Sequence, residues 1–163
     1  MTLLGRRFRQ LAYVTNDFDR ALAEIGGQAG IPAFLELRDT LIEIGPTAQA
    51  RCHVALAMMG GLQIEIIEPR GGHDDIFRDD LRGTGFITRF HHAAQAVKSE
   101  ESFETLQRET AANGFAVTAA GTSPQGIRYF YADMRPLLGH YMEYAWCPPD
   151  ALEGFLSAIP VRA

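Results

Sequence analysis

Four polar side chains interrupt apolar segments of the chain and have the chemistry of metal ligands. They are Gln10, Glu65, His92 and Glu143. Burial of an unpaired carboxylate is costly, so each glutamate must face water, pair with a cation or bind a metal ion. Two carboxylates, an imidazole and a carboxamide form an oxygen and nitrogen ligand set. Such a set suits a divalent Ni, Co, Zn, Mn or Mg ion, with positions left open for water or substrate.

Taken singly, a glutamate in an antiparallel strand usually points to solvent, and this explanation competes with metal binding. The chain, however, repeats itself, and equivalent residues of a repeat are expected to share a role. Residues 8–14 and 90–97 share the frame Phe-x-(Gln/His)-x-Ala, and each is followed by a helical stretch and β-rich segments. The last strand of each copy holds a glutamate, Glu65 or Glu143. Strand alternation puts Glu65 on the same face as Gln63, and Ile64 and Ile66 on the other face. A duplicated fold would bring the four side chains to a common pseudo-twofold axis.

The elements that must position these residues can be read from local signals. A first helix is expected after Asn16 or Asp17, either of which can accept an amide hydrogen bond at the N-cap. A second helix is expected after Ser99, with Asn113-Gly114 as its left-handed stop. Strands are predicted at 34–38, 53–59 and 62–68, and again at 115–119, 128–134 and 141–146. Gly60-Gly61 suits a hairpin turn.

These elements predict an α+β fold in which two tandem βαβββ modules form a curved, barrel-like mixed sheet. The first module is expected at 1–72 and the second at 88–148. Residues 73–87 are interpreted as a linker with a short helix, and residues 149–163 as a C-terminal helix and tail.

Composition excludes several classes of protein. With 163 residues, 47% of them hydrophobic, the chain can bury a core. The formal charge is −5 and the Lys and Arg residues are scattered, so a nucleic-acid partner is not expected. Neither a membrane span nor a secretory signal is visible, which favours a cytoplasmic protein. Cys52 and Cys147 are isolated and are interpreted as buried small hydrophobic residues.

The segments that carry the candidate ligands resemble those of the vicinal oxygen chelate superfamily. This group contains glyoxalase I, methylmalonyl-CoA epimerase, extradiol dioxygenases and bleomycin-resistance proteins. The similar segments are Gln10-Leu11-Ala12-Tyr13-Val14, Leu62 to Pro69, Gly83-x-Gly85 through Phe90-His91-His92, and Gly139 to Glu143. The resemblance implies a glyoxalase-like fold with Gln10, Glu65, His92 and Glu143 at the four ligand positions, a set similar to that of glyoxalase I. Whether His91 rather than His92 is the third ligand stays open.

The resemblance also implies an activity. Non-redox members abstract a proton next to a carbonyl, with the metal stabilising the developing enediolate. We therefore expect a metal-dependent isomerase, epimerase or lyase that acts on a small carbonyl substrate such as a thioester or thiol adduct. Glu143 is the first choice for the base and Glu65 the second. A homodimer is expected, and the ligands could come from one chain or two.

Two other functions compete with this one. A metal-free protein of the bleomycin-resistance type would bind a drug-like molecule in the same cleft. An Fe(II) ring-cleaving dioxygenase needs two histidines and one carboxylate, so Gln10 and Glu65 argue against it.

Several other polar residues have simpler explanations than a role in the site. His53 is interpreted as a hydrogen-bonded strand residue, and His73-Asp74-Asp75 as a solvated linker rather than a metal cluster. Arg128 could contact an anionic substrate together with Tyr129 and Tyr131, although strand tyrosines more often belong to a core.

Overall fold

The same order of elements, a strand, a helix and three further strands, occurs twice along the chain. The computed structural model describes residues 9–162. The first copy consists of β1 (Arg9–Thr15), α1 (Phe18–Ala29), β2 (Leu35–Gly45), β3 (Ala48–Met59) and β4 (Leu62–Gly72). The second consists of β5 (Thr88–Ala96), α3 (Glu100–Ala112), β6 (Val117–Thr122), β7 (Arg128–Asp133) and β8 (Tyr141–Trp146). The short helices α2 (Asp75–Arg78), η2 (Asp79–Leu81) and α4 (Arg135–Leu138), together with α5 (Pro149–Ala158) and β9 (Val161–Arg162), complete the described chain.

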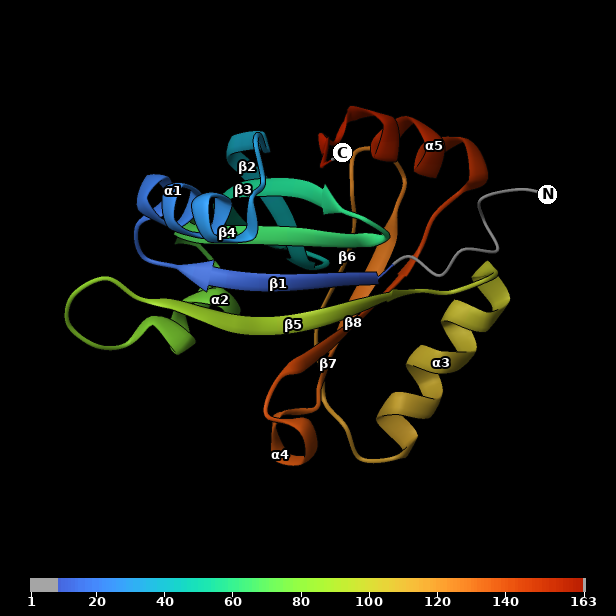
Figure 1. The fold of residues 1–163 in the computed structure, drawn as a ribbon. Coiled ribbons are helices and arrows are strands. Elements are labelled where there is room, and N and C mark those ends of the chain that lie inside the picture. Colours follow the sequence, from blue (N-terminus) through green and yellow to red (C-terminus); the bar gives the residue numbers. More distant parts are fainter. Residues whose placement is uncertain (1–8, 163) are drawn as a thin grey trace.

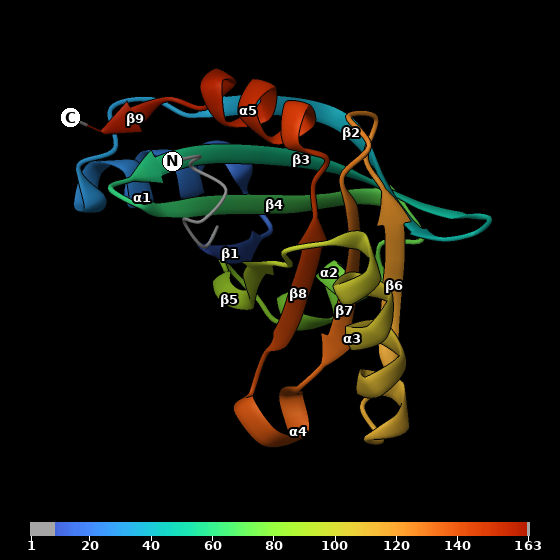
Figure 2. The ribbon, with the colours of Figure 1, turned by 90° about the vertical axis from the view of Figure 1, so that its right-hand side faces the viewer.

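Eight of the strands follow one another in the order β2-β3-β4-β1-β5-β8-β7-β6, and β9 adds to β3. The two copies meet where β1 pairs antiparallel with β5. Within each copy the first strand is parallel to the last, β1 to β4 and β5 to β8. Figure 1 shows α1 and α3 outside the sheet, and Figure 2 shows β6, β7 and β8 running across the direction of β3 and β4. The sheet is therefore mixed and strongly curved, as predicted.

Strands β2 and β6, the two ends of this order, approach one another through Glu43. The backbone N–H of Thr122 donates to Glu43 Oε2 at 2.9 Å, and the hydroxyl of Tyr129 donates to the Glu43 carbonyl at 2.9 Å. A Cβ on Gly121 would lie only 2.8 Å from that carbonyl oxygen, so the close approach depends on glycine. These contacts make the sheet a nearly closed barrel, and the α+β, glyoxalase-like fold class is confirmed.

Alternation along β4 separates core residues from site residues. Ile66 packs beneath α1 against Phe18, and Ile64 lies in a neighbouring apolar cluster. Gln63 and Glu65 point the other way and line a cavity inside the barrel. Successive strand residues face opposite sides of a sheet, so this division was expected from the sequence.

The helix caps and the hairpin turn agree with the sequence. The side chain of Asp17 accepts from the N–H of Arg20 at the start of α1, and that of Ser99 accepts from the N–H of Ser102 at the start of α3. The Gly60-Gly61 turn joins β3 to β4. The residue boundaries of the two modules stay a prediction.

Several predicted segments differ from the structure. Strand β3 begins at Ala48 rather than at residue 53, and β6 spans Val117–Thr122 rather than 115–119. Strand β2 extends beyond 34–38 to Gly45 because residues 40–45 pair with the start of β3. The interpretation of His73-Asp74-Asp75 as solvated is wrong for Asp74, which is buried. Its carboxylate accepts from the N–H of Gly71 at 2.8 Å and pairs with Arg78.

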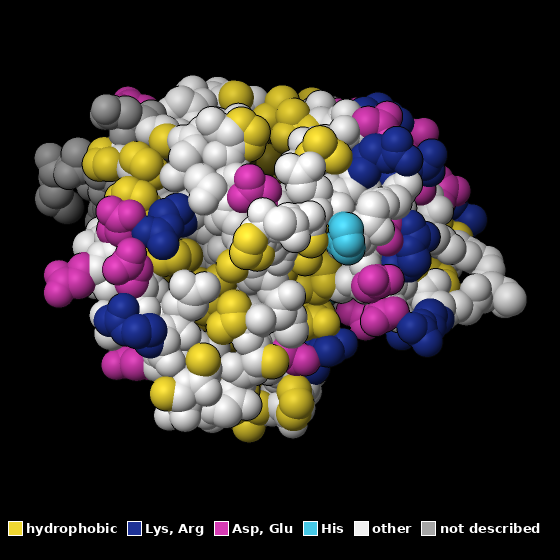
Figure 3. All heavy atoms as spheres, turned by 180° about the vertical axis from the view of Figure 1, so that it is seen from behind, with side chains coloured by type: hydrophobic (Ala, Val, Ile, Leu, Met, Phe, Trp, Pro, Cys, Tyr) yellow, Lys and Arg dark blue, Asp and Glu magenta, His cyan; other side chains and the backbone are white. Residues whose placement is uncertain are grey.

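Charged side chains of both signs lie near one another on one face of the molecule (Figure 3). On the face opposite to that of Figure 1, Lys and Arg side chains lie towards the two sides, close to acidic ones, and hydrophobic side chains show between them (Figure 3). None of the helices in residues 9–162 is long and apolar enough to cross a membrane.

Candidate metal centre

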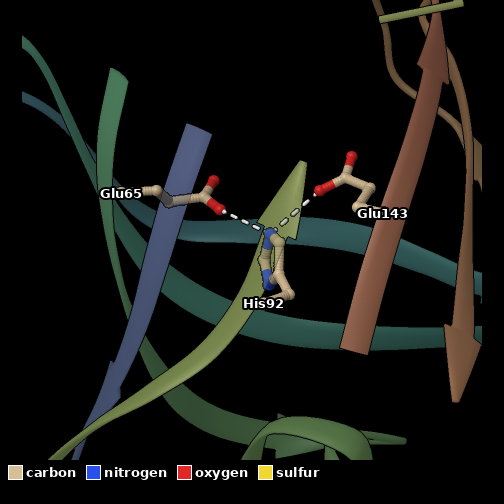
Figure 4. A group of neighbouring side chains, drawn as sticks. All are labelled: Glu65, His92 and Glu143. Carbon is tan, nitrogen blue, oxygen red and sulfur yellow. Dashed lines mark ion pairs between the residues drawn. The ribbon is translucent and has the colours of Figure 1, made fainter. Parts of the chain in front are cut away.

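Three of the four predicted ligands converge inside the barrel. His92 Nε2 lies 2.9 Å from Glu143 Oε2 and 3.4 Å from Glu65 Oε2. One potential ligand atom from each residue fits within 4.8 Å of the others. Figure 4 shows the two carboxylates converging on the same nitrogen of the imidazole, Glu65 of β4 from the left and Glu143 of β8 from the right, with His92 on β5 below them. Side chains far apart in the sequence thus meet at one point.

The strand register explains why they meet. Ala12 of β1 pairs with Glu65 on one side and with His92 on the other. Ala94 of β5 pairs in the same way with Gln10 and with Glu143. The site therefore occupies two adjacent rows of side chains across the sheet. Because each row has a small alanine in its middle, there is room for the longer polar side chains to reach the centre.

Gln10 lies beside this cluster. It lines the same cavity as Glu65 and Glu143, and its Nε2 donates to Oε1 of Gln63 at 2.9 Å. This hydrogen bond leaves Oε1 of Gln10 as the atom that could bind a cation. Gln63 was placed on the face of Glu65 by strand alternation but was not predicted as a site residue. Its Nε2 is buried and has no hydrogen-bond partner among the described residues.

His91 does not join the cluster. Its Nε2 lies 2.8 Å from the carbonyl oxygen of Ile76, and its Nδ1 lies 2.8 Å from Nδ1 of His92. Burial, with a contribution from His92, lowers the pKa of His91 to about 3, so its ring stays neutral. His92 is thus the better candidate for the third ligand.

The Ile76 carbonyl fixes the protons of both rings. A carbonyl oxygen can only accept, so Nε2 of His91 carries the hydrogen and Nδ1 of His91 is an acceptor. The hydrogen between the rings must then belong to Nδ1 of His92. When His92 is neutral, its lone pair is therefore on Nε2, the atom between the two carboxylates. In histidines that bind metals, the ring nitrogen that does not bind the metal is typically held by a hydrogen bond.

The electrostatics of the cluster are those of a site that holds a cation or protons. Burial lowers the pKa of His92, but the carboxylates of Glu143 and Glu65 outweigh burial and raise it to about 9. Burial is the main cause that raises the pKa of Glu65, and the charge of Glu143 adds to it. Burial, followed by the charges of Glu143 and Glu65, raises the pKa of Tyr131 well above its usual value, so this hydroxyl stays protonated.

These residues fit a divalent metal ion. His92 Nε2 is fully buried and has no well-aligned hydrogen-bond partner in residues 9–162, although it lies 2.9 Å from Glu143 and 3.4 Å from Glu65. Buried polar atoms are rarely left without a partner, so such an atom beside two carboxylates needs an explanation. An imidazole nitrogen and carboxylate oxygens are suitable ligands for the first-row divalent metals.

The remaining sequence candidates lie as follows. Tyr129 and Tyr131 line the cavity. Arg128 does not, because it pairs with Glu100 at 2.6 Å and with Glu104 at 3.3 Å on α3. His53 accepts the backbone N–H of Asp39 through Nδ1 at 3.0 Å, which agrees with its interpretation as a hydrogen-bonded strand residue.

A duplicated βαβββ chain whose mixed sheet closes around a buried polar cluster defines the class of glyoxalase-like proteins. The sequence agrees with this assignment. Residues 9–131 match the pattern of the Glyoxalase/Bleomycin resistance protein/Dioxygenase superfamily, and the chain belongs to this superfamily. No curated protein matches the chain by sequence.

Solved structures with the same fold include methylmalonyl-CoA epimerases. The enzyme from Mycobacterium tuberculosis is 15% identical, with a TM-score of 0.57 over 94% of this chain and 95% of that one. A Streptomyces coelicolor variant in complex with 2-nitronate-propionyl-CoA is 16% identical, with a TM-score of 0.59 over 86% and 94% of the two chains. A hypothetical protein from Bacillus halodurans is 20% identical, with a TM-score of 0.57 over 85% and 92%. At these identities the likeness shows the fold alone.

Proposed function

We propose that this protein is a divalent-metal-dependent isomerase, epimerase or lyase that removes a proton next to the carbonyl of a small substrate. The observation that carries the proposal is the convergence of Glu65, His92 and Glu143, whose ligand atoms lie within 4.8 Å of one another. Gln10 is the fourth proposed ligand. Membership of a superfamily that includes glyoxalases supports the same class of reaction.

The residues of the site have different proposed roles in this reaction. A bound divalent ion would supply Lewis acidity toward the substrate carbonyl. Glu143 is the proposed base, because its carboxylate lines the cavity and lies beside the protonated Tyr131. Glu65 is the second proposed proton carrier, because its carboxylate also lines the cavity.

The pair of carboxylates suits an epimerase in particular. Glu65 and Glu143 reach the same nitrogen of His92, one from the left and one from the right in Figure 4. A carbon atom held between them could lose its proton to one carboxylate and receive a proton from the other on its opposite face. An isomerase or lyase would need only one of the two as base.

The experiment combines metal analysis with hydrogen exchange. The protein is stripped with EDTA, reloaded separately with Ni, Co, Zn, Mn or Mg, and incubated in deuterium oxide with 2-oxo-aldehyde hemithioacetals and acyl thioesters. We expect about one ion per chain and exchange of the hydrogen next to the carbonyl, followed by NMR. Glu143→Gln should lose the exchange, whereas His73→Gln, at an exposed histidine, should keep it. Full exchange by Glu143→Gln would exclude this glutamate as the base.

A metal-free binding protein is the second candidate. The observation that favours it is a cavity of about 270 Å³ whose lining is largely apolar. Failure to retain or rebind any of the five metals, together with tight binding of a drug-like molecule, would support this function instead. A homodimer stays a prediction for both candidates.

A further inference from the structure

The lining of the cavity that contains the candidate metal centre is polar at one end and largely apolar elsewhere. Its inner end is polar and includes Gln10, Gln63, Glu65 and Glu143. Its outer part is lined by apolar side chains of β2, the segment before β7, and α5. These include Leu37, Leu41, Ile42, Ile127 and Phe155. A molecule that reaches the inner end must therefore lie along an apolar wall.

Cationic side chains are absent from this wall among residues 9–162. The charged residues that line the cavity are Glu65 and Glu143. Arg38, close to the lining residue Leu37 in sequence, is bound to Asp19 at 2.6 Å and to Glu36 at 2.7 Å. Arg128 is bound to α3 as described above. An anionic group in the outer cavity would thus be desolvated without a partner, which is unfavourable.

The other titratable groups of the outer cavity are neutral. Burial raises the pKa of the Cys147 thiol to about 11, and burial raises the pKa of the Tyr129 hydroxyl above its usual value. Both groups therefore stay protonated at neutral pH. The polar lining residues of this part, such as Thr40 and Gln125, also carry no charge.

Large apolar side chains remain exposed at the edge of the cavity. The exposed fraction is 55% for Leu41 and 38% for Leu37. Both lie on β2 and both line the cavity, so a ligand in the cavity would cover them. Covering exposed apolar surface is favourable in proportion to the area removed from water.

We propose that the natural ligand of this cavity has an uncharged, apolar body, an alkyl or aryl group, that lies between β2 and α5. Its polar end faces Glu65, His92 and Glu143. That this end is a carbonyl rests on the function proposed above, whereas the nature of the body rests on the outer wall alone. A carboxylate or phosphate on the body is disfavoured in the cavity.

Two dyes that share an aromatic frame and differ in charge test this inference. N-phenyl-1-naphthylamine is neutral, and 8-anilino-1-naphthalenesulfonate carries a negative charge. Each is titrated by fluorescence into the full chain after treatment with EDTA. We expect the neutral dye to bind with a stoichiometry of one per chain and at least tenfold more tightly than the sulfonate. Equal affinities, or no binding of the neutral dye, would overturn the proposal.

A charge substitution at the edge of the cavity locates the binding site. Leu41→Arg should reduce the preference for the neutral dye at least tenfold, because the guanidinium would pair with the sulfonate. Leu137→Arg is the matched control, since Leu137 is 69% exposed on α4 and does not line the cavity. Phe155→Ala should weaken binding of the neutral dye and provides a second test. If Leu41→Arg keeps the same ratio of affinities for the two dyes and Phe155→Ala keeps the same affinity for the neutral dye, the dye binds elsewhere and the inference is refuted.

The outcome can be separated from that of the proposed function. The dyes are bound by metal-free protein, so their affinities do not depend on a metal ion or on proton exchange. Metal binding and exchange without the expected dye preference would refute only the nature of the ligand body. If Leu41→Arg instead converts a dimer to a monomer on size exclusion without altering dye preference, this edge is an interface between copies and the inference is wrong.

Discussion

Nδ1 of His91 lies 2.8 Å from Nδ1 of His92, and the Ile76 carbonyl at the far side of His91 determines that His92 donates the hydrogen bond between the two rings. This chain of hydrogen bonds from Ile76 through His91 to His92, the His91 relay, directs the lone pair of neutral His92 toward the two carboxylates. His91 is therefore a positioning residue for the candidate metal centre, although it is not itself a ligand.

The first prediction concerns this relay. His91→Phe should lower the affinity for a divalent ion about 10–100-fold, since loss of such a supporting hydrogen bond typically has this effect. His91→Asn should retain more of the affinity, because its side-chain oxygen can accept from Nδ1 of His92. Calorimetric titration with Zn or Co measures both values. Equal losses in the two variants would show that His91 matters for packing rather than for the hydrogen bond.

The second prediction concerns the pH dependence of stability without metal. The pKa of His92 is raised from 6.5 to about 9 in the folded protein. Its stabilising contribution is thus fully present below pH 6.5 and is lost as the pH rises through 9. The shift corresponds to at most roughly 3 kcal/mol. The raised pKa of Glu65 acts in the same direction, beginning at lower pH.

Thermal unfolding of EDTA-treated protein between pH 6 and 10 checks this dependence. The melting temperature should fall across this range in the natural protein and in the exposed-site control His73→Gln. It should fall less in His92→Asn. A melting temperature that rises from pH 7 to 9 would contradict the charge state inferred for His92.

The third prediction concerns the two glutamines. Gln10 and Gln63 are buried and are joined by a hydrogen bond of 2.9 Å. Gln10→Leu and Gln63→Leu should each lower the free energy of unfolding by about 1–3 kcal/mol, since each leaves a buried amide without its partner. The double variant should lose less than the sum of the two. Additive losses in urea unfolding would mean that the two amides do not interact.

The fourth prediction concerns closure of the barrel. Gly121→Ala would place a methyl group 2.5 Å from Cβ of Glu43, so β6 must move away from β2. Such overpacking costs about 1–3 kcal/mol. Gly27→Ala is the control, because nothing lies within 4 Å of its added Cβ and alanine favours a helix. Similar stability of the two variants in chemical denaturation would show that β2 and β6 do not need this close approach.

Local signals in the sequence predicted the longer helices and the sites of most strands correctly, whereas the short helix α4 was not predicted. Asp17 and Ser99 cap helices because their short side chains reach backbone N–H groups within the same turn. Alternation in β4 likewise predicted the face on which Gln63 and Glu65 lie. The second half of β2 was missed, since its exposed and half-buried residues are held by pairing with β3 rather than by an apolar pattern.

Internal duplication predicted which residues belong together, and the structure brings Glu65, His92 and Glu143 within bonding range of one ion. Their roles as ligands and base stay predictions. The relay through His91 depends on the Ile76 carbonyl of α2, which is brought close to His91 by tertiary packing. Duplication of the sequence could not reveal this contact. Nor could it show that Arg128 is bound to α3 and is kept out of the cavity.

The two rows of side chains that cross the seam between β1 and β5 are not equivalent to one another. Glu143 pairs across the strands with Tyr131, whereas Glu65 shares its face of β4 with Gln63, and only one copy contributes an imidazole. A compound held between these unlike walls meets a phenol on one side and a carboxamide on the other. The two orientations of this compound that are related by the pseudo-twofold rotation would therefore bind with different energies, so a backbone with near-twofold symmetry still favours one orientation.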